Sequence, residues 1–185
     1  ELWKSDGTAA GTVMVKDINP NDHSFPGDFT VFDNLLFFNA RDGINGAELW
    51  MSDGTTAGTV MVKDINPGSS SGYPSEITVF DNSLYFKATD GSTGIELWKS
   101  DGTAAGTVMV KDIRPGSSWS DPNGLTVFDN TLYFHATDGI HGDELWKSDG
   151  TASGTVMVKD INPSGRSGPV NLIVFDNLLY FMADD

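Results

Sequence analysis

The chain has 185 residues, of which 38% are hydrophobic and 20% are charged, a composition typical of a folded soluble domain rather than a disordered segment. Its 26 acidic and 11 basic residues give a formal net charge of −15, which repels phosphate backbones and anionic lipid, so we expect neither nucleic-acid binding nor membrane insertion. It contains no cysteine, which excludes disulfides, thiolate metal sites and a cysteine nucleophile.

A unit of 47 or 48 residues is repeated along the chain. Each copy opens with Glu-Leu-Trp, at Glu1, Glu48, Glu96 and Glu144. It continues with Ser-Asp-Gly-Thr and Gly-Thr-Val-Met-Val-Lys-Asp-Ile, and later carries Val-Phe-Asp-Asn before an aromatic run. The copies span residues 1–47, 48–95, 96–143 and 144–185. Because repeats of this length build extended arrays or closed rings, we expect a single repeat domain over residues 1–185.

Each copy is expected to supply four short strands joined by tight turns. Apolar and β-branched residues mark the strands, which across the third and fourth copies are 125–128, 132–136, 144–148 and 156–161. Between them lie turn signals rich in Asp, Asn and Gly, at 129–130, 138–142 and 149–154. Gly or Pro interrupts every window of helix length, and no window has helical apolar spacing. We therefore predict an all-β fold.

Four antiparallel strands per repeat predict a β-propeller with one blade per repeat. A blade is covered on both faces by its neighbours, which explains continuous apolar runs such as Val13–Val15. A β-solenoid would need shorter coils, and a sandwich would not normally repeat its sequence four times.

The phase of the repeat predicts how the ring closes. The first residues supply the third and fourth strands of a blade, and the last run, Leu179–Ala183, is a second strand. We expect four blades of four antiparallel strands, with the ring closed by N-terminal strands pairing with C-terminal strands. Two chains sharing an eight-bladed ring, or a slice of a longer array, are the alternatives. Glu1 falls inside a predicted blade, without a signal peptide or initiator Met before it, so we expect a processed chain or a fragment.

The run Glu-Leu-Trp-Lys-Ser-Asp-Gly-Thr at Glu1 and its three later counterparts resemble the bacterial ELWxxDGT repeat family, over essentially all 185 residues. The resemblance implies a secreted or surface-attached bacterial protein with an adhesive or binding role, and hence an extracellular or cell-surface location. It supplies no catalytic residues. The Ser-Asp-Gly-Thr turn is also similar to the Asp-box of sialidase-type propellers, where this turn is a structural hairpin.

Two residue types recur in every copy, and both are interpreted as structural. One aspartate lies in the turn between the third and fourth strands, as Asp6, Asp53, Asp101 and Asp149. Its carboxylate can accept N–H bonds within the turn, whereas a single carboxylate offers too few oxygens for Ca²⁺. One tryptophan follows Glu-Leu, as Trp3, Trp50, Trp98 and Trp146. Its fixed strand position predicts packing between blades, and an aromatic platform for sugars is the alternative.

A second acidic pattern brackets the Gly-x-x-Gly loop between the second and third strands. An aspartate precedes a glutamate by six residues in three copies, as Asp42 with Glu48, Asp90 with Glu96, and Asp138 with Glu144. Two carboxylates that close a short loop could hold Ca²⁺ together with backbone carbonyls and water. Pairing with lysine and capping of backbone amides are the alternatives, and we expect no other cofactor.

The copies differ most in the linkers that join one blade to the next. In an up-and-down blade, the linkers and the Gly-x-x-Gly loops share one face of the ring, and binding sites concentrate on loops of rigid scaffolds. Candidate ligand-binding residues on this face are His23, Phe25, Tyr73, Trp119, Asp121, His141 and Arg166. Aromatic rings flanked by polar residues suit a glycan or protein partner. The alternative is that each aromatic plugs the ring mouth or packs under its own loop.

We expect no enzyme. The three histidines, His23, His135 and His141, occupy non-equivalent positions, and no spacing places a catalytic partner beside them. An active site on a ring usually needs one blade that differs sharply from the rest, and these copies hardly differ. The sequence therefore predicts a non-enzymatic extracellular binding or scaffold module with a lectin-like loop face. A self-associating structural unit of a larger assembly or filament is the alternative, and a hydrolase-type propeller is a distant one.

Overall fold

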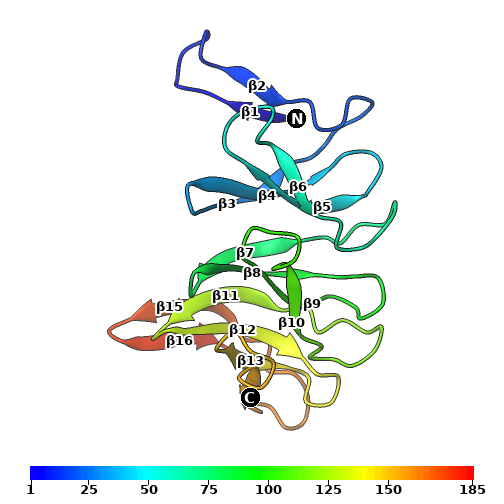
Figure 1. Cartoon of the computed structure of the whole chain (residues 1–185). Helices are drawn as coiled ribbons and strands as arrows, with labels where there is room; N and C mark the ends of the chain where they lie inside the picture. Colours follow the sequence, from blue (N-terminus) through cyan, green and yellow to red (C-terminus); the bar gives the residue numbers. More distant parts are fainter.

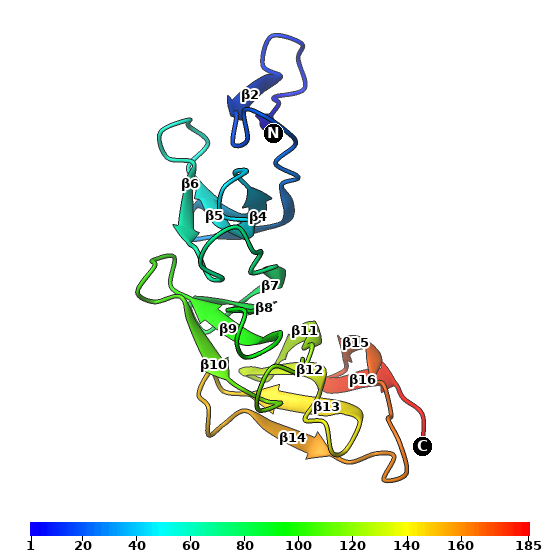
Figure 2. The same ribbon diagram turned by 90° about the vertical axis from the view of Figure 1, so that its right-hand side faces the viewer.

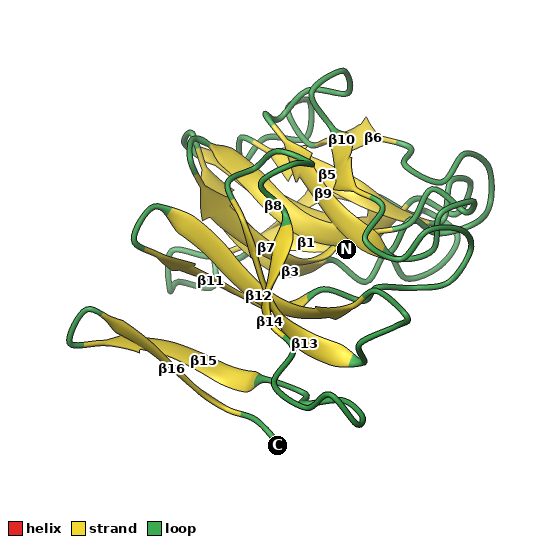
Figure 3. Cartoon of the chain, turned by 90° about the horizontal axis from the view of Figure 1, so that it is seen from below, coloured by secondary structure: helices red, strands yellow, loops and turns green.

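A computed structural model describes all 185 residues, which form strands, turns and loops but no helix (Figure 3). No segment therefore meets the length and apolarity that a membrane-crossing helix requires. The sixteen strands form three sheets of four strands and two sheets of two strands. All pairings are antiparallel, and the predicted all-β fold is confirmed.

The three complete sheets are named blades 1 to 3, and the two incomplete sheets are the N-terminal and C-terminal half-blades. The N-terminal half-blade contains β1 (Leu2–Lys4) and β2 (Val13–Lys16). Blade 1 contains β3 (Gly27–Phe32), β4 (Leu35–Arg41), β5 (Ala47–Ser52) and β6 (Val60–Lys63). Blade 2 contains β7 (Ser75–Phe80), β8 (Ser83–Ala88), β9 (Glu96–Ser100) and β10 (Val108–Lys111). Blade 3 contains β11 (Asn123–Phe128), β12 (Thr131–Thr137), β13 (Asp143–Ser148) and β14 (Val156–Lys159). The C-terminal half-blade contains β15 (Val170–Phe175) and β16 (Leu178–Met182).

The blades have a propeller-like arrangement. Within each blade the strands pair in chain order. The first strands of successive units lie next to one another, β3 beside β7, β7 beside β11, and β11 beside β15. The units follow one another along an arc, as Figure 1 and Figure 2 show from two directions. The first strand of each unit is therefore innermost.

The two-residue Asp-Asn turns join the first and second strands of blades 1 to 3 and of the C-terminal half-blade. In each turn both residues have positive φ, for example 48° at Asp33 and 60° at Asn34. This geometry is that of a type I′ turn, whose twist matches the flanking strands and whose positive φ suits Asn and Asp. The observed strands lie within two residues of the four predicted in the third and fourth copies. β11 begins two residues earlier, β12 is one residue longer at each end, β13 begins one residue earlier, and β14 ends at Lys159 instead of residue 161.

The hydrophobic core lies between the blades. Blade 1 supplies Phe37, Leu49, Val62 and Ile65 to one cluster, and blade 2 supplies Ile77, Leu84, Phe86, Ala88 and Trp98. A second cluster joins blades 2 and 3, and a third joins the N-terminal half-blade to blade 1. Trp50, Trp98 and Trp146 are buried in these three clusters, one in each. The packing role predicted for the repeated tryptophan holds for these three copies.

The predicted pairing of N-terminal and C-terminal strands is not present in this structure. β1–β2 and β15–β16 remain separate two-stranded sheets. They lie at opposite ends of the arc in both ribbon views (Figures 1 and 2). The physical reason is that three packed interfaces fix the angle between neighbouring units, and these angles leave the two half-blades apart.

Candidate functional site

One edge of the structure gathers the linkers and the Gly-x-x-Gly loops. The linkers are residues 19–26, 67–74, 115–122 and 163–169, and the loops are 42–46, 90–94 and 138–142. We call this edge the loop face; it lies to the right in Figure 1, whereas the Asp-Asn hairpins point to the left. Backbone bonds join the two kinds of loop, as where the Tyr73 amide donates to the Ala47 carbonyl at 3.2 Å.

A buried glutamate holds each linker in place. In blade 2, Glu96 is fully buried and its carboxylate accepts the amides of Ile113 at 2.8 Å and Ser120 at 3.1 Å. The Ser120 hydroxyl donates to the same carboxylate at 2.6 Å. Glu144 makes the corresponding three bonds in blade 3, and Glu48 accepts the two corresponding amides in blade 1, where Gly72 takes the place of the serine. The first glutamate of the repeat is therefore a clamp between the third strand, the end of the fourth strand and the linker.

Burial raises the pKa of Glu48 and of Glu96 to about 7, although the hydrogen bonds from backbone amides act to lower it. For Glu48, the nearby carboxylate of Asp64 adds to the increase. For Glu96, Asp112 contributes in the same way. These two clamps are therefore titratable groups in the frame of the loop face.

The aspartate at the start of each Gly-x-x-Gly loop has a separate set of partners. Asp138 accepts the amides of Ile140 at 2.8 Å and His141 at 2.9 Å, and His141 Nδ1 lies 2.7 Å from its other oxygen. Partial burial acts to raise the pKa of Asp138, but the bonds from His141 and Ile140 lower it overall. Asp42 and Asp90 close their loops in the same manner.

In each predicted pair, the aspartate thus closes the Gly-x-x-Gly loop and the glutamate holds the linker, each through its own hydrogen bonds. No group of three or more His, Asp and Glu side chains is placed to share a metal ion. The carboxylate oxygens of Glu48 and Asp42 already accept amide bonds, which leaves fewer of them for a cation. Calcium binding at these loops stays a prediction, and amide capping, its stated alternative, is observed.

The three linker aromatics are exposed. The exposed fraction is 62% for Phe25, 54% for Tyr73 and 59% for Trp119. Phe25 and Tyr73 stand at one position of the repeat, directly before proline, where φ is 46° and 52°. Asp121 has the same backbone conformation at this position in the next copy. Trp119 lies two residues earlier, in the position of His23 and Arg166, so the aromatics form two sets instead of one.

The loop face is hollowed beside Phe25. One hollow of 160 Å³ is lined by both Phe25 and Tyr73, together with Asn39 and Arg41. A second hollow, of 240 Å³, lies on the other side of Phe25 and includes His23. The Arg41 guanidinium lies 5.8 Å from the centre of the Phe25 ring, a distance at which cation and ring attract each other. Two aromatic rings and a guanidinium therefore border one open depression.

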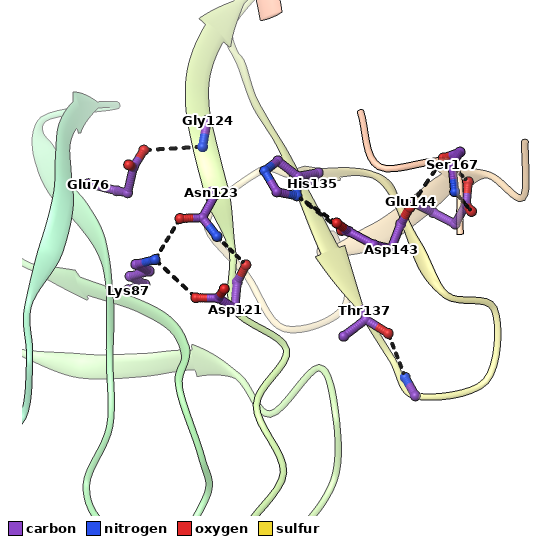
Figure 4. Close-up of polar contacts among 11 residues, drawn as sticks. Glu76, Lys87, Asp121, Asn123, Gly124, His135, Thr137, Asp143, Glu144 and Ser167 are labelled. Atoms are coloured by element: carbon purple, nitrogen blue, oxygen red, sulfur yellow. Dashed lines mark hydrogen bonds and ion pairs between the residues drawn. The ribbon is translucent and has the colours of Figure 1, made fainter. Parts of the chain in front are cut away.

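A polar hollow of 280 Å³ occupies the loop face of blade 3. Asp121, His135, Asp143 and Arg166 line it, with Ser120 at its wall. His135 Nδ1 lies 3.0 Å from Asp143 Oδ1, as Figure 4 shows. The structure thus brings two of the predicted residues, Asp121 and Arg166, into one depression, but with charged and polar groups in place of rings.

Lys87 ties blade 2 to the linker that leads into blade 3. Its Nζ donates to Asp121 Oδ1 at 2.9 Å and to Asn123 Oδ1 at 2.5 Å (Figure 4). Glu76 accepts the amide of Gly124 at 3.1 Å across the same boundary. One carboxylate oxygen of Asp121 is therefore already used in a contact between blades.

Sequence reasoning missed Asn39, Arg41 and Asp143, which line the hollows, and Lys87, which binds Asp121 beside them. A signal for them exists in the repeat. Asn39, Lys87 and His135 replace one another on the second strand, and this position varies while its neighbours stay constant. Variation between copies within a strand, and not only within linkers, marks the lining of the loop face.

Comparison with known proteins finds no matching family model and no matching curated protein. Among solved structures, a computationally designed protein called Ika8 has a TM-score of 0.46 at 16% identity; the match covers 97% of this chain and 45% of the designed chain. An α-L-arabinofuranosidase from Clostridium thermocellum has a TM-score of 0.39 at 12% identity over 96% of this chain and 74% of its own. An endo-arabinase from Bacteroides thetaiotaomicron has a TM-score of 0.34 at 11% identity over 85% and 62%. The chain thus spans less than half of the designed protein, and these scores carry no information on activity.

Proposed function

We propose that this chain is a non-enzymatic binding module, extracellular or attached to a cell surface, that holds a glycan or protein partner on its loop face. The observation that carries the proposal is the hollow shared by Phe25 and Tyr73. Both rings are more than half exposed, and both border the same depression. Exposed aromatic rings on a rigid frame bind at low entropic cost, because few torsions must be fixed.

The chemistry of this hollow suits a sugar ring or an extended peptide. Phe25 and Tyr73 offer apolar faces, Arg41 offers N–H donors, and Asn39 offers its Oδ1 as an acceptor beside them. Asn39 is already oriented, because its Nδ2 donates to Asp28 at 2.7 Å and to the Pro74 carbonyl at 3.2 Å. A few fixed polar groups among apolar surface are what ligand sites use to set orientation.

No reaction is part of the proposal. His135 and Asp143 are paired in the polar hollow, but the Ser120 hydroxyl at its wall donates to the buried Glu96. That hydroxyl is buried and serves the clamp. The resemblance to the ELWxxDGT repeats supports an adhesive role and an extracellular location.

A second candidate function is that of a structural unit in a larger assembly. The observation in its favour is that the two half-blades carry complementary strands, β15–β16 the first pair and β1–β2 the second pair. Joined together, they would give a fourth blade of the same strand order. A closed ring of such blades would also make a more rigid platform for the loop face.

The binding proposal is tested by probing the labelled chain on arrays of glycans and of peptides. We expect one class of probe to be bound, and Tyr73→Ala to weaken that binding about tenfold or more, which corresponds to about 1.4 kcal/mol. The matched control is Val108→Ala, an exposed apolar residue that begins β10 after the tight turn on the opposite edge. Absence of any bound probe, or equal loss in both variants, would contradict the proposal.

A further inference from the structure

The C-terminal half-blade presents a strand edge that every complete blade covers. In blades 1 to 3, the second strand pairs with a third strand over five or six residue pairs. β16 pairs only with β15, and β1 pairs only with β2. Each of these two strands therefore leaves one edge of backbone N–H and C=O groups unpaired in the sheet.

The repeat fixes which residues should face each other across these edges. In the complete blades a phenylalanine stands opposite the repeated tryptophan, as Phe38 with Trp50, Phe86 with Trp98, and Phe134 with Trp146. These six side chains are buried, with exposed fractions from 0% to 6%. Their counterparts in the half-blades are Phe181 and Trp3, which are 37% and 58% exposed. The two halves of one buried pair are thus present but unassembled.

The outer part of blade 3 lacks the same neighbour. Trp50 packs against Leu2, Val15 and Ile18 of the unit before it. Leu145, Val158 and Ile161 are the corresponding residues of blade 3. Val158 is 45% exposed, whereas its counterparts Val15, Val62 and Val110 are 6% to 8% exposed. Blade 3 therefore has an uncovered apolar surface of the shape that receives a tryptophan from a third strand.

We propose that these surfaces bind the β1–β2 hairpin of a second copy of this chain. In the composite blade, Phe181 of one copy faces Trp3 of the other, and Tyr180 faces Lys4. Trp3 then covers Val158, as Trp50 covers Val15 within the chain. The register follows from the pairs Tyr85 with Lys99 and Tyr133 with Lys147.

A second copy fits better than closure within one chain. The half-blades of one chain lie at opposite ends of the arc (Figures 1 and 2), and bringing them together would disrupt packed interfaces between blades. A second copy can pair without any change in these interfaces. Two copies that exchange hairpins reciprocally have three complete blades each and share two composite blades. This head-to-tail contact gives a closed ring of copies when the rotation between them allows it. Otherwise further copies add on and form an open filament.

The chain contains no cysteine, so paired cysteines report this register directly. The variants Lys4→Cys and Tyr180→Cys are purified separately, mixed in equal amounts and oxidised gently. We expect a covalent heterodimer with twice the 19.9 kDa mass of the chain. Lys4→Cys mixed with Met182→Cys is the matched control. Its cysteines are displaced by two residues, roughly 7 Å along the strand, so we expect about fivefold less heterodimer.

Three outcomes decide between the possibilities. Preferential cross-linking of the in-register mixture supports exchange between copies. A disulfide that forms only inside a Lys4→Cys/Tyr180→Cys double variant, with no heterodimer from the mixture, shows closure within one chain and overturns the proposal. Equal yields from in-register and control mixtures overturn it as well. Ser5→Cys with Leu179→Cys provides a second in-register pair, in case the Tyr180 variant fails to fold. None of these results depends on the ligand of the loop face.

Discussion

At the scale of the residue, the side chain of the repeated glutamate connects the strands of a blade to the linker on the loop face. Glu96 accepts two backbone amides and one hydroxyl, and all of these partners belong to the end of β10 or to the linker. Burying a carboxylate is costly unless its oxygens are hydrogen-bonded. The buried glutamate therefore orders the linker, and the same burial raises its pKa, to about 7 for Glu48 and for Glu96.

This shift predicts a pH dependence of stability. A carboxyl whose pKa rises from 4.5 to about 7 on folding is less stable as an anion in the folded chain. The contribution of each glutamate to the free energy of unfolding is therefore greatest below pH 4.5 and is lost as pH rises through 7, a loss of roughly 3 kcal/mol for each. Urea unfolding at several pH values measures it. We expect Glu96→Gln to flatten this pH dependence by about half, and an unchanged slope in the variant would contradict the assignment.

At the scale of the element, the turn between the third and fourth strands is built in the same way in every copy. In blade 2, Asp101 accepts the amide of Thr103 at 2.8 Å and its hydroxyl at 2.7 Å. The Thr103 hydroxyl in turn accepts the amide of Gly106 at 3.0 Å. The Thr103 hydroxyl lowers the pKa of Asp101 more than any other contact. The structural role predicted for this aspartate agrees with these bonds.

The same turn makes Gly106 sensitive to substitution. A Cβ placed on Gly106 would lie 2.0 Å from Asp101 Oδ1, so one of the two groups must move. We expect Gly106→Ala to lower the free energy of unfolding by about 1 to 3 kcal/mol, the usual cost of overpacking. Thermal or urea unfolding gives the value. Asp101→Ala removes the obstructing carboxylate, so the double variant should cost less than the sum of the two single changes. Strict additivity would show that the contact is absent.

Strands and turns of this chain could be predicted closely because their signals are local. Asp129-Asn130 identifies a hairpin from two residues, and β11 and β12 flank it as expected. The start of the first strand was less accessible to sequence reasoning. Residues with positive φ occur twice there, at Tyr73 and Glu76, and the register shifts between Ser75 and Thr78. This irregularity follows from how the linker meets the preceding clamp, which no short motif encodes.

At the scale of the whole molecule, the repeat predicts the order of strands but not the rotation between blades. That rotation depends on how Phe37, Phe86 and Trp98 fill the space between sheets, and each contact joins residues about one repeat apart. The candidate site shows the same limit. Phe25 and Tyr73 were predicted from their type and place, whereas the meeting of these two rings, from successive linkers, at one hollow depends on the spacing of neighbouring units.

The rotation between blades also determines whether the half-blades are exposed or paired. In this structure the arc leaves Trp3 and Phe181 exposed, although their counterparts are buried in every complete blade. Exposed apolar surface with an unpaired strand edge is a strong drive toward association. The assembly of the half-blades into a complete blade is therefore the central claim about the whole molecule.

Light scattering of the purified chain in solution tests that claim most directly. We expect a mass of twice 19.9 kDa, or a larger multiple, and the loss of this larger mass when Trp3→Lys and Phe181→Lys place charges on the two edges. A wild-type mass near 19.9 kDa at micromolar concentration, unchanged in the variants, would contradict association between copies.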